Sequence, residues 1–175
     1  MKQNKSIGIA VVGAGRIGTL RARLAAKHPS VRFLAISDRD PARARLLAEQ
    51  AGADLHTASN EEVISHPDVT AVIVSTPEQQ HTEPILQALR LGKPVLVEKP
   101  IGFSLSDADK ILTTLYQTKG ELRVGYSRRY KECFLRAKEQ CGTSGSARSS
   151  AAPRGSTIRG PRPSPSSSAI RTSPR

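Results

Sequence analysis

Three glycines near the start of the chain have the spacing of a phosphate-binding loop. Gly13, Gly15 and Gly18 follow an apolar stretch, residues 7–12, and open a segment of helical character. The first glycine permits a tight turn, the second lets the backbone approach a pyrophosphate, and the third lets the helix pack close to the strand. The N-terminus of that helix offers free N–H groups to phosphates. The sequence therefore predicts a dinucleotide-binding loop.

An acidic residue lies at the distance from this loop that dinucleotide binding requires. Twenty positions after Gly18, a second apolar stretch, residues 31–37, ends at Asp38. A carboxylate at that point can accept hydrogen bonds from the hydroxyls of an adenosine ribose. An interpretation without a ligand stays open, in which the glycines only close a strand–helix turn and Asp38 caps the next helix.

Alternating strand and helix patterns would place these residues at one edge of a sheet. The expected strands cover residues 7–12, 31–37, 54–57, 70–75, 94–98 and 121–126. The expected helices cover residues 16–27, 42–51, 83–91, 106–119 and 129–140, with a short one capped by Asn60. This alternation predicts an α/β fold with a doubly wound parallel sheet of the Rossmann type. Ligands of such sheets bind beyond the carboxyl ends of the strands.

Three further segments follow expected strands and so face the same crevice. They are Ser75-Thr76-Pro77 with His81 shortly after, Glu98-Lys99-Pro100, and the stretch from Gly125 to Tyr130. Together with the glycine loop, these segments resemble the motifs of the Gfo/Idh/MocA family, which includes glucose–fructose oxidoreductase and inositol dehydrogenase. The matching motifs are GAGRIG at 13–18, Asp38, STPEQQH at 75–81, GKPV at 92–95, EKP at 98–100 and GYSRRY at 125–130.

The resemblance covers about residues 6–140 and implies both a fold and an activity. It implies a nucleotide-binding Rossmann domain followed by an α+β domain that carries the substrate pocket. The implied activity is that of an NAD(P)-dependent dehydrogenase, which moves a hydride between nicotinamide and a hydroxyl group of an inositol, a sugar or a related polyol.

The resemblance also implies which residues hold the cofactor. These are Gly13, Gly15, Arg16, Ile17, Gly18, Asp38, Arg39, Ser75, Thr76, Pro77, His81 and Glu98. The backbone N–H groups of Arg16 and Ile17 would face the pyrophosphate, and the segment 75–77 would lie beneath the nicotinamide ribose. Asp38 implies NAD, whereas Arg39 leaves NADP open, because a guanidinium there can accept a 2′-phosphate.

Lys99 is the expected catalytic residue, since it matches the lysine of the family that contacts the reacting hydroxyl. A lysine desolvated beside a nicotinamide can join a proton relay, and its ammonium form can polarise a carbonyl in the reverse reaction. An ordinary exposed lysine before a proline-initiated loop is the alternative. Glu98 is expected to orient Lys99 or to cap a loop. For His81, a place in the nicotinamide pocket and a plain role in a first helical turn both stay open.

The end of the chain differs in composition from the rest. Residues 141–175 contain six Arg and no Asp, Glu or Lys, so they carry half of the formal charge of +12. They are rich in Ser and Pro and nearly devoid of bulky apolar residues, so we expect them to be disordered. Binding of nucleic acid by this segment would be non-specific, because no aromatic residues are interleaved for base stacking.

The second domain that the resemblance implies does not fit into residues 141–175. We therefore expect a shifted reading frame near residue 141. One choice of codons for residues 156–168, read in the adjacent frame, gives the apolar pattern of folded protein. The expected domains are a Rossmann domain at 1–127, a connecting helix at 128–140 and a disordered tail at 141–175. Such a chain would bind the cofactor but lack the substrate domain, and sequencing the gene around codon 141 tests this expectation.

Other function classes find little support in the sequence. No stretch has the pattern of a signal peptide or the length of a membrane span. Cys133 and Cys141 are expected to be free thiols, and no residues have metal-ligand spacing. The sequence therefore predicts a cytoplasmic protein without a metal, a membrane partner or a specific nucleic-acid partner. The resemblance leaves a homo-oligomer open, and a non-catalytic, redox-sensing nucleotide-binding module is the alternative to a dehydrogenase.

Overall fold

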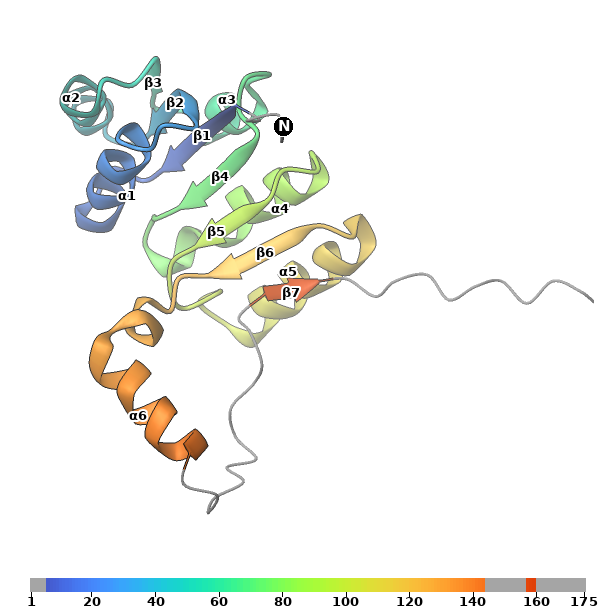
Figure 1. The fold of residues 1–175 in the computed structure, drawn as a ribbon. Coiled ribbons are helices and arrows are strands. Elements are labelled where there is room, and N and C mark those ends of the chain that lie inside the picture. Colours follow the sequence, from blue (N-terminus) through green and yellow to red (C-terminus); the bar gives the residue numbers. More distant parts are fainter. Residues whose placement is uncertain (1–5, 144–156, 160–175) are drawn as a thin grey trace, which may run out of the picture.

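A twisted sheet forms the centre of the computed structural model, which describes residues 6–143 and 157–159 (Figure 1). Within these residues, the strand order is β3-β2-β1-β4-β5-β6-β7. The first six strands pair in parallel and β7 pairs antiparallel to β6. Their bounds are β1 Ile7–Val12, β2 Val31–Ser37, β3 Leu55–Thr57, β4 Ala71–Val74, β5 Val95–Val97, β6 Glu121–Val124 and β7 Thr157–Arg159. The predicted doubly wound parallel sheet is confirmed.

Helices cover the two faces of the sheet unequally. On one face, α1 (Arg16–Ala26) and α2 (Pro41–Ala51) pack against residues of β1 and β2. On the other face, a larger apolar core joins the sheet to α3 (Asn60–Ser65), α4 (Thr82–Arg90) and α5 (Leu105–Thr118). The face of β5 and β6 on the α1 side has no helix over it in the described part of the chain (Figure 1).

The register of the strands brings their carboxyl ends to one level. Val12 of β1 pairs with Ser37 of β2 and with Val74 of β4. Val97 of β5 pairs with Val74 and with Val124 of β6. The segments after these strands therefore leave the sheet at the same edge. The strand order reverses between β1 and β4, which is where doubly wound sheets open a ligand crevice.

Capping side chains explain where two helices begin. Asp40 accepts hydrogen bonds from the backbone N–H groups of Ala42 and Arg43 and so starts α2. The expected cap of α3, Asn60, is wrong: Ser59 accepts from the N–H of Glu62 at 3.2 Å instead. The Asn60 amide oxygen is engaged elsewhere, because it accepts a hydrogen bond from the Ser37 hydroxyl at 2.8 Å.

Short elements that the apolar pattern does not predict connect the expected ones. Two 3-10 turns, η1 (Glu78–Gln80) and η2 (Ser127–Tyr130), follow β4 and β6, and η2 leads into α6 (Glu132–Thr143). The strand β7 was likewise not expected. Residues 144–156 and 160–175 lie outside the described residues. The disorder and the shifted frame expected there, and the division into 1–127, 128–140 and 141–175, stay predictions.

Candidate functional site

The glycine loop has a backbone that only glycine fits at two of its three positions. Gly13 has a φ of +99°, and a Cβ there would lie 2.8 Å from the backbone of Ser75. A Cβ on Gly18 would lie 1.8 Å from the carbonyl oxygen of Gly13. Gly15 differs, since a Cβ there would meet no described atom within 4 Å. Two glycines thus hold the loop against α1 and β4, and the third opens onto free space.

The N-terminus of α1 faces this free space. Gly15 is the N-cap of the helix and offers no side chain to its first N–H groups. In an α-helix the first N–H groups have no partner within the helix, so those of Arg16 and Ile17 point toward the loop opening. No acidic residue lies in the first turn of α1. This arrangement is suited to an anion such as a pyrophosphate.

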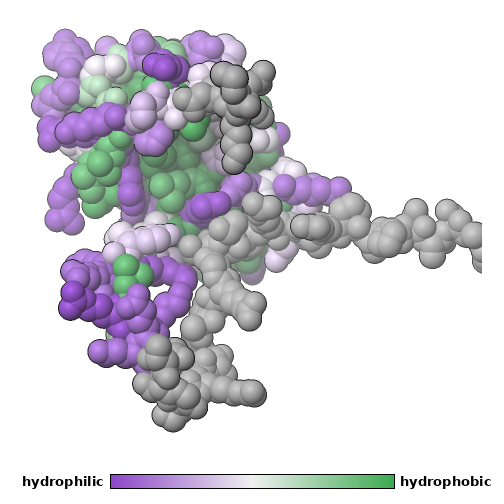
Figure 2. All heavy atoms as spheres, viewed as in Figure 1, coloured by the Kyte–Doolittle hydropathy of each residue, from purple (hydrophilic) through white to green (hydrophobic). Residues whose placement is uncertain are grey.

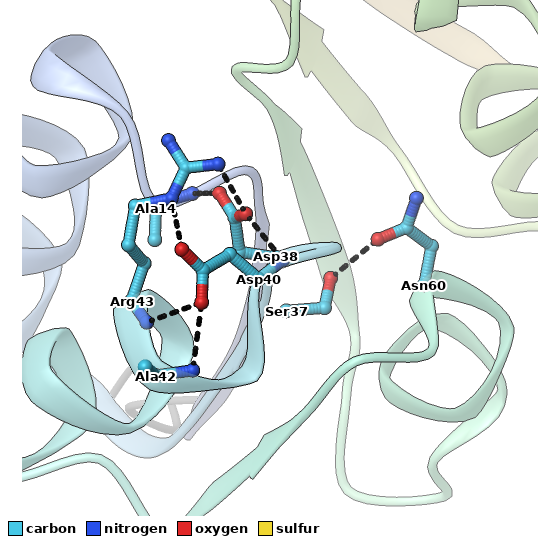
Figure 3. A network of polar contacts seen from close by, with 7 residues as sticks. All are labelled: Ala14, Ser37, Asp38, Asp40, Ala42, Arg43 and Asn60. Carbon is cyan, nitrogen blue, oxygen red and sulfur yellow. Dashed lines mark hydrogen bonds and ion pairs between the residues drawn. The ribbon is translucent and has the colours of Figure 1, made fainter.

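Asp38 is the centre of a polar network at the end of β2 (Figure 3). Its Oδ2 accepts a hydrogen bond from the N–H of Ala14 at 2.8 Å, and its Oδ1 accepts one from the N–H of Asp40 at 2.9 Å. The guanidinium of Arg43 lies 3.1 Å from Oδ1 and 3.2 Å from the carboxylate of Asp40. Asp38 is buried and does not cap α2, since Asp40 does. The interpretation in which Asp38 serves as a helix cap is therefore wrong.

A cavity of about 140 Å³ lies between the glycine loop, Asp38 and the end of β4. Of the residues expected to hold a cofactor, it is lined by Gly13, Gly15, Asp38, Arg39, Ser75, Thr76 and Pro77. It is also lined by Arg43, Asn60 and Gln80, which sequence reasoning missed. The pair Asp40 and Arg43, one helical turn apart, was a signal for Arg43 that could have been used.

Two hydroxyl groups in the cavity wall have no partner in the described part of the protein. The side-chain oxygens of Ser75 and Thr76 are buried and make no hydrogen bond there. Buried polar atoms are rarely left without a partner, so such a pair marks a place where a ligand or water completes the structure. Unpaired hydroxyls, the open side of Gly15 and the Asp38 carboxylate together fit a nucleotide with ribose hydroxyls and phosphates.

The segment from Glu98 to Pro100 follows β5 and lies outside this cavity. The Lys99 side chain is exposed, and its ammonium has no hydrogen bond or ion pair with any residue that the structure describes. The Lys99–Pro100 peptide bond is cis. The carboxylate of Glu98 accepts hydrogen bonds from Nε and Nη2 of Arg21 in α1, at 2.8 and 2.5 Å. Sequence reasoning also missed Arg21, because 77 positions separate it from Glu98.

His81 is fully buried and also lies outside the cavity lining. Its Nδ1 lies 2.8 Å from the carbonyl oxygen of Pro100, and its Nε2 lies 3.0 Å from that of Thr76. His81 stands at the start of α4, as one alternative from the sequence expects, and its ring lies between these two carbonyl oxygens. Its place in a nicotinamide pocket stays a prediction. His81 joins the segments that follow β4 and β5.

A larger hollow of about 510 Å³ lies beside the uncovered face of β5 and β6. Its wall includes Leu96 of β5, Tyr126, Tyr130 of η2, and Leu135 of α6. Figure 2, drawn from the same side as Figure 1, shows hydrophobic surface on this side of the molecule above α6. Basic side chains also border the hollow, among them Arg129, whereas Arg128 lies in a neighbouring depression beside Phe134.

The described residues contain no group of three or more side chains that could together hold a metal ion. Cys133 and Cys141 are free and exposed. None of the helices formed by these residues combines the length and the apolar character needed to cross a bilayer.

Known proteins resemble this chain over its Rossmann part. The family model of Gfo/Idh/MocA proteins, described as an oxidoreductase family with an NAD-binding Rossmann fold, matches residues 7–126. Inositol 2-dehydrogenase of Rhizobium meliloti is 30% identical over 134 residues, which cover 77% of this chain and 40% of that protein. The 2,7-anhydro-N-acetylneuraminate hydratase of Mediterraneibacter gnavus is 36% identical over 110 residues, covering 63% and 29%.

A solved structure agrees with this similarity. The scyllo-inositol dehydrogenase from Lactobacillus casei, solved with bound cofactor NAD(H) and scyllo-inositol, superposes with a TM-score of 0.73 at 27% sequence identity. The match covers 79% of this chain and 41% of that one. The chain thus spans about 40% of the length of these inositol dehydrogenases.

Proposed function

Because the chain belongs to the Gfo/Idh/MocA oxidoreductase family, whose Rossmann fold binds NAD, we propose that it holds NAD(H) in the crevice at the carboxyl ends of β1, β2 and β4. The observation that carries this proposal is the cavity in which seven expected cofactor residues meet. They come from three separate parts of the sequence, and two of their hydroxyls are buried without a partner.

The parts of the cofactor are assigned to groups of matching chemistry. The N–H groups of Arg16 and Ile17 would hold the pyrophosphate, with Gly15 leaving room for its approach and Gly13 and Gly18 shaping the loop. Asp38 would accept hydrogen bonds from the adenosine ribose hydroxyls, since a carboxylate has lone pairs beyond those that Ala14 and Asp40 engage. The segment 75–77 would lie beneath the nicotinamide ribose.

NAD is proposed as the preferred cofactor over NADP. The buried Asp38 carboxylate would repel a 2′-phosphate placed on the same ribose. Arg43 is occupied with Asp38 and Asp40 and so does not offer a free guanidinium to that phosphate. Arg39, which lines the cavity, is the residue whose guanidinium could still bind the 2′-phosphate of NADP.

The proposed reaction is the oxidation of a secondary hydroxyl of a polyol or sugar, carried out by the whole protein of which this Rossmann part binds the cofactor. When bound, the nicotinamide supplies a hydride acceptor or donor. The Nζ of Lys99 would take the proton of the substrate hydroxyl and return it in the reverse direction. The inositol dehydrogenases among the relatives support this substrate class. A cytoplasmic location and association into homo-oligomers belong to the same proposal.

Isothermal titration calorimetry of the chain with NADH and NADPH tests the cofactor proposal. We expect NADH to bind more tightly than NADPH. The variant Asp38→Asn keeps the size of the side chain but not its charge, and we expect it to weaken NADH binding about tenfold or more, because charge-assisted hydrogen bonds contribute about 1.5–3 kcal/mol. Arg45→Ala, an exposed change on α2 whose ion pair with Glu49 is 3.8 Å long, is the matched control. Folded protein that gives no heat with NADH would contradict the proposal.

A further inference from the structure

The segment Glu98–Pro100 is held on both sides of Lys99 by side chains from opposite layers of the fold. Arg21 belongs to α1 on one face of the sheet, and it binds the Glu98 carboxylate. His81 occupies the N-cap position of α4 on the other face without a capping hydrogen bond, and its Nδ1 lies 2.8 Å from the carbonyl oxygen of Pro100. We propose that Arg21 and His81 are positioning residues for Lys99. This proposal rests on the role of Lys99 in the proposed function.

The first of these two contacts, between Arg21 and Glu98, is called the Glu98 anchor, and the second, between His81 and Pro100, the Pro100 anchor. The Glu98 anchor is closely packed. Both Nε and Nη2 of Arg21 donate to Oε1 of Glu98, and both side chains are largely buried. Hydrogen bonds of this charge-assisted kind are stronger than neutral ones. On the other side of the carboxylate lies Gly125, where a Cβ would approach Oε2 to 3.1 Å. The Glu98 side chain therefore passes between α1 and the end of β6, a space that a residue larger than glycine at 125 would narrow.

The Pro100 anchor depends on a buried ring. His81 is 1% exposed, and both of its nitrogens face carbonyl oxygens, which only accept hydrogen bonds. The imidazolium form donates to both oxygens, and a neutral ring donates to one. A proton on Nδ1 fixes Pro100, and a proton on Nε2 fixes Thr76. Only the doubly protonated ring ties the segment of Lys99 to the segment that lines the cofactor cavity, whereas a neutral ring holds the one segment to which it donates.

The two anchors leave Lys99 with its own side-chain torsions as its main freedom. Its neighbours on either side are fixed, and the backbone N–H of Glu98 also donates to the carbonyl of Val74 in β4 at 3.0 Å. The exposed ammonium thus starts from a fixed backbone position beside the crevice. Fixing a reacting group before the substrate arrives lowers the entropy cost of the reaction.

A pair of substitutions at one position separates the two bonds of His81. The amide nitrogen of Asn lies near the place of Nδ1, whereas that of Gln lies near the place of Nε2. We expect His81→Asn to keep the bond to Pro100 and lose the bond to Thr76, and His81→Gln to do the reverse. The readouts are the NMR order parameters of the backbone amides of Lys99 and Thr76, measured on the full chain.

The expected result is a crossed pattern. In His81→Gln the order parameter of Lys99 falls from about 0.85 to below about 0.6, while that of Thr76 is retained. In His81→Asn the Thr76 value falls and the Lys99 value is retained. NADH affinity should fall several-fold in His81→Asn, because Thr76 lines the cavity, and should change less than twofold in His81→Gln.

The Arg21 anchor is tested with Arg21→Lys, which keeps the charge but cannot donate two bonds in a fixed fork. We expect lower order at Lys99 and unchanged order at Thr76. Arg23→Ala, on the same helix and bonded to Gln50 at the surface, is the control and should leave both amides unchanged. Arg21→Lys also keeps the proposal testable if the His81 variants do not fold.

These measurements distinguish a failure of the positioning proposal from a failure of the proposed function. An unchanged Lys99 order parameter in both His81→Gln and Arg21→Lys would overturn the positioning proposal, whatever the chain binds. Failure of the wild-type chain to bind NADH, with the crossed pattern intact, would instead overturn the proposed function and leave the two anchors as a feature of the fold.

Discussion

The two sides of the crevice, one formed by Asp38 and the glycine loop and the other by Lys99, differ in how many contacts the described residues make to hold them. On the cofactor side, Asp38 is buried and held by three neighbours, and Gly13 and Gly18 are locked by close backbone contacts. On the other side, Lys99 is exposed and only its chain neighbours are held. The difference shows that contacts among the described residues hold the Asp38 side of the crevice in place, whereas the Lys99 side chain makes no such contact with them.

The cover of the sheet explains this contrast. The strands β1, β2 and β4 carry helices on both faces, so the segments that follow them are anchored from both sides. The strands β5 and β6 carry α4 and α5 on one face, and on the other they border the hollow of about 510 Å³ (Figures 1 and 2). Tyr126, Tyr130, Phe134 and Leu135 are exposed near this hollow.

The substitution Gly18→Ala should give the largest effect on the cofactor side. The new Cβ would lie 1.8 Å from the Gly13 carbonyl oxygen, within backbone that cannot yield without moving the loop. We expect the free energy of unfolding to fall by about 3 kcal/mol or more and NADH binding to be lost. Urea unfolding and calorimetry measure the two effects. A stable variant that still binds NADH would show that the loop is less rigid than the structure indicates.

The substitution Gly15→Ala sharpens the comparison, because it alters the same loop without a clash in the protein. No described atom lies within 4 Å of the new Cβ, so we expect stability to change by less than about 1 kcal/mol. The methyl group would occupy the space through which a pyrophosphate approaches the backbone, so NADH affinity should fall about tenfold. Equal NADH affinity in Gly15→Ala and wild type would place the phosphates elsewhere.

A change of cofactor preference is the next expected effect in size. In Asp38→Ser the carboxylate is absent, and Arg43 keeps its ion pair with Asp40 through Nε. Its Nη2 loses its partner and can meet a 2′-phosphate together with Arg39. We expect the ratio of NADPH to NADH affinity to rise by at least about tenfold, measured by titration with both cofactors. In the double variant Asp38→Ser/Arg43→Ala the gain in NADPH affinity should disappear. A gain that survives there would assign the preference to Arg39 alone.

The smallest expected effect is a loss of folding stability at acidic pH, caused by Asp107 at the start of α5 near Lys99. The helix α5 starts just after Pro100 with a capping box, in which the Ser104 hydroxyl and the Asp107 carboxylate bind each other's backbone N–H. The hydrogen bond from Ser104 lowers the pKa of Asp107 below its ordinary value of 3.8. Because the folded protein favours the ionised form, the contribution of Asp107 to stability is present above pH 3.8 and is lost as the pH falls through the lower folded value.

The variant Asp107→Asn tests this effect. We expect the wild type to be more stable than the variant at neutral pH, and the difference to shrink below pH 3.8, in thermal unfolding measured at several pH values. As the pH falls below 3.8 in the wild type, the rate of backbone amide hydrogen exchange should rise first in the segment before α5. A difference that stays constant down to the acid limit would show that Asp107 acts through its shape and not through its charge.

Local signals in the sequence predicted the cofactor side well. Gly13, Gly15 and Gly18 act over a few residues, and the apolar runs of β1 and β2 place Asp38 at a strand end without knowledge of any distant contact. The fold class follows from the alternation of strands and helices, and the family and its NAD cofactor follow from these residues together with the motifs after the later strands, such as EKP at 98–100; all three are confirmed. The cap of α3 was missed because Ser59 and Asn60 are both good caps, and only the position of Ser37 decides between them.

Contacts on the Lys99 side could not be predicted, because they join residues distant in the sequence. Arg21 meets Glu98 across 77 positions, and His81 meets Pro100 across 19. Both contacts depend on the order of the strands and on which face each helix covers. A sequence pattern carries no such information for a single arginine or histidine, so the sequence leaves the contacts of Glu98 and His81 open.

The contact of Gly18 with the Gly13 carbonyl limits how this protein can be redesigned. The loop, the first turn of α1 and the backbone of Ser75 form one interlocked unit, so a change in any of them disturbs the others. Arg39, Arg43 and Asn60 border the same cavity but lie outside that unit. Libraries aimed at synthetic or truncated nicotinamide analogues should therefore vary these three positions and leave the glycines untouched.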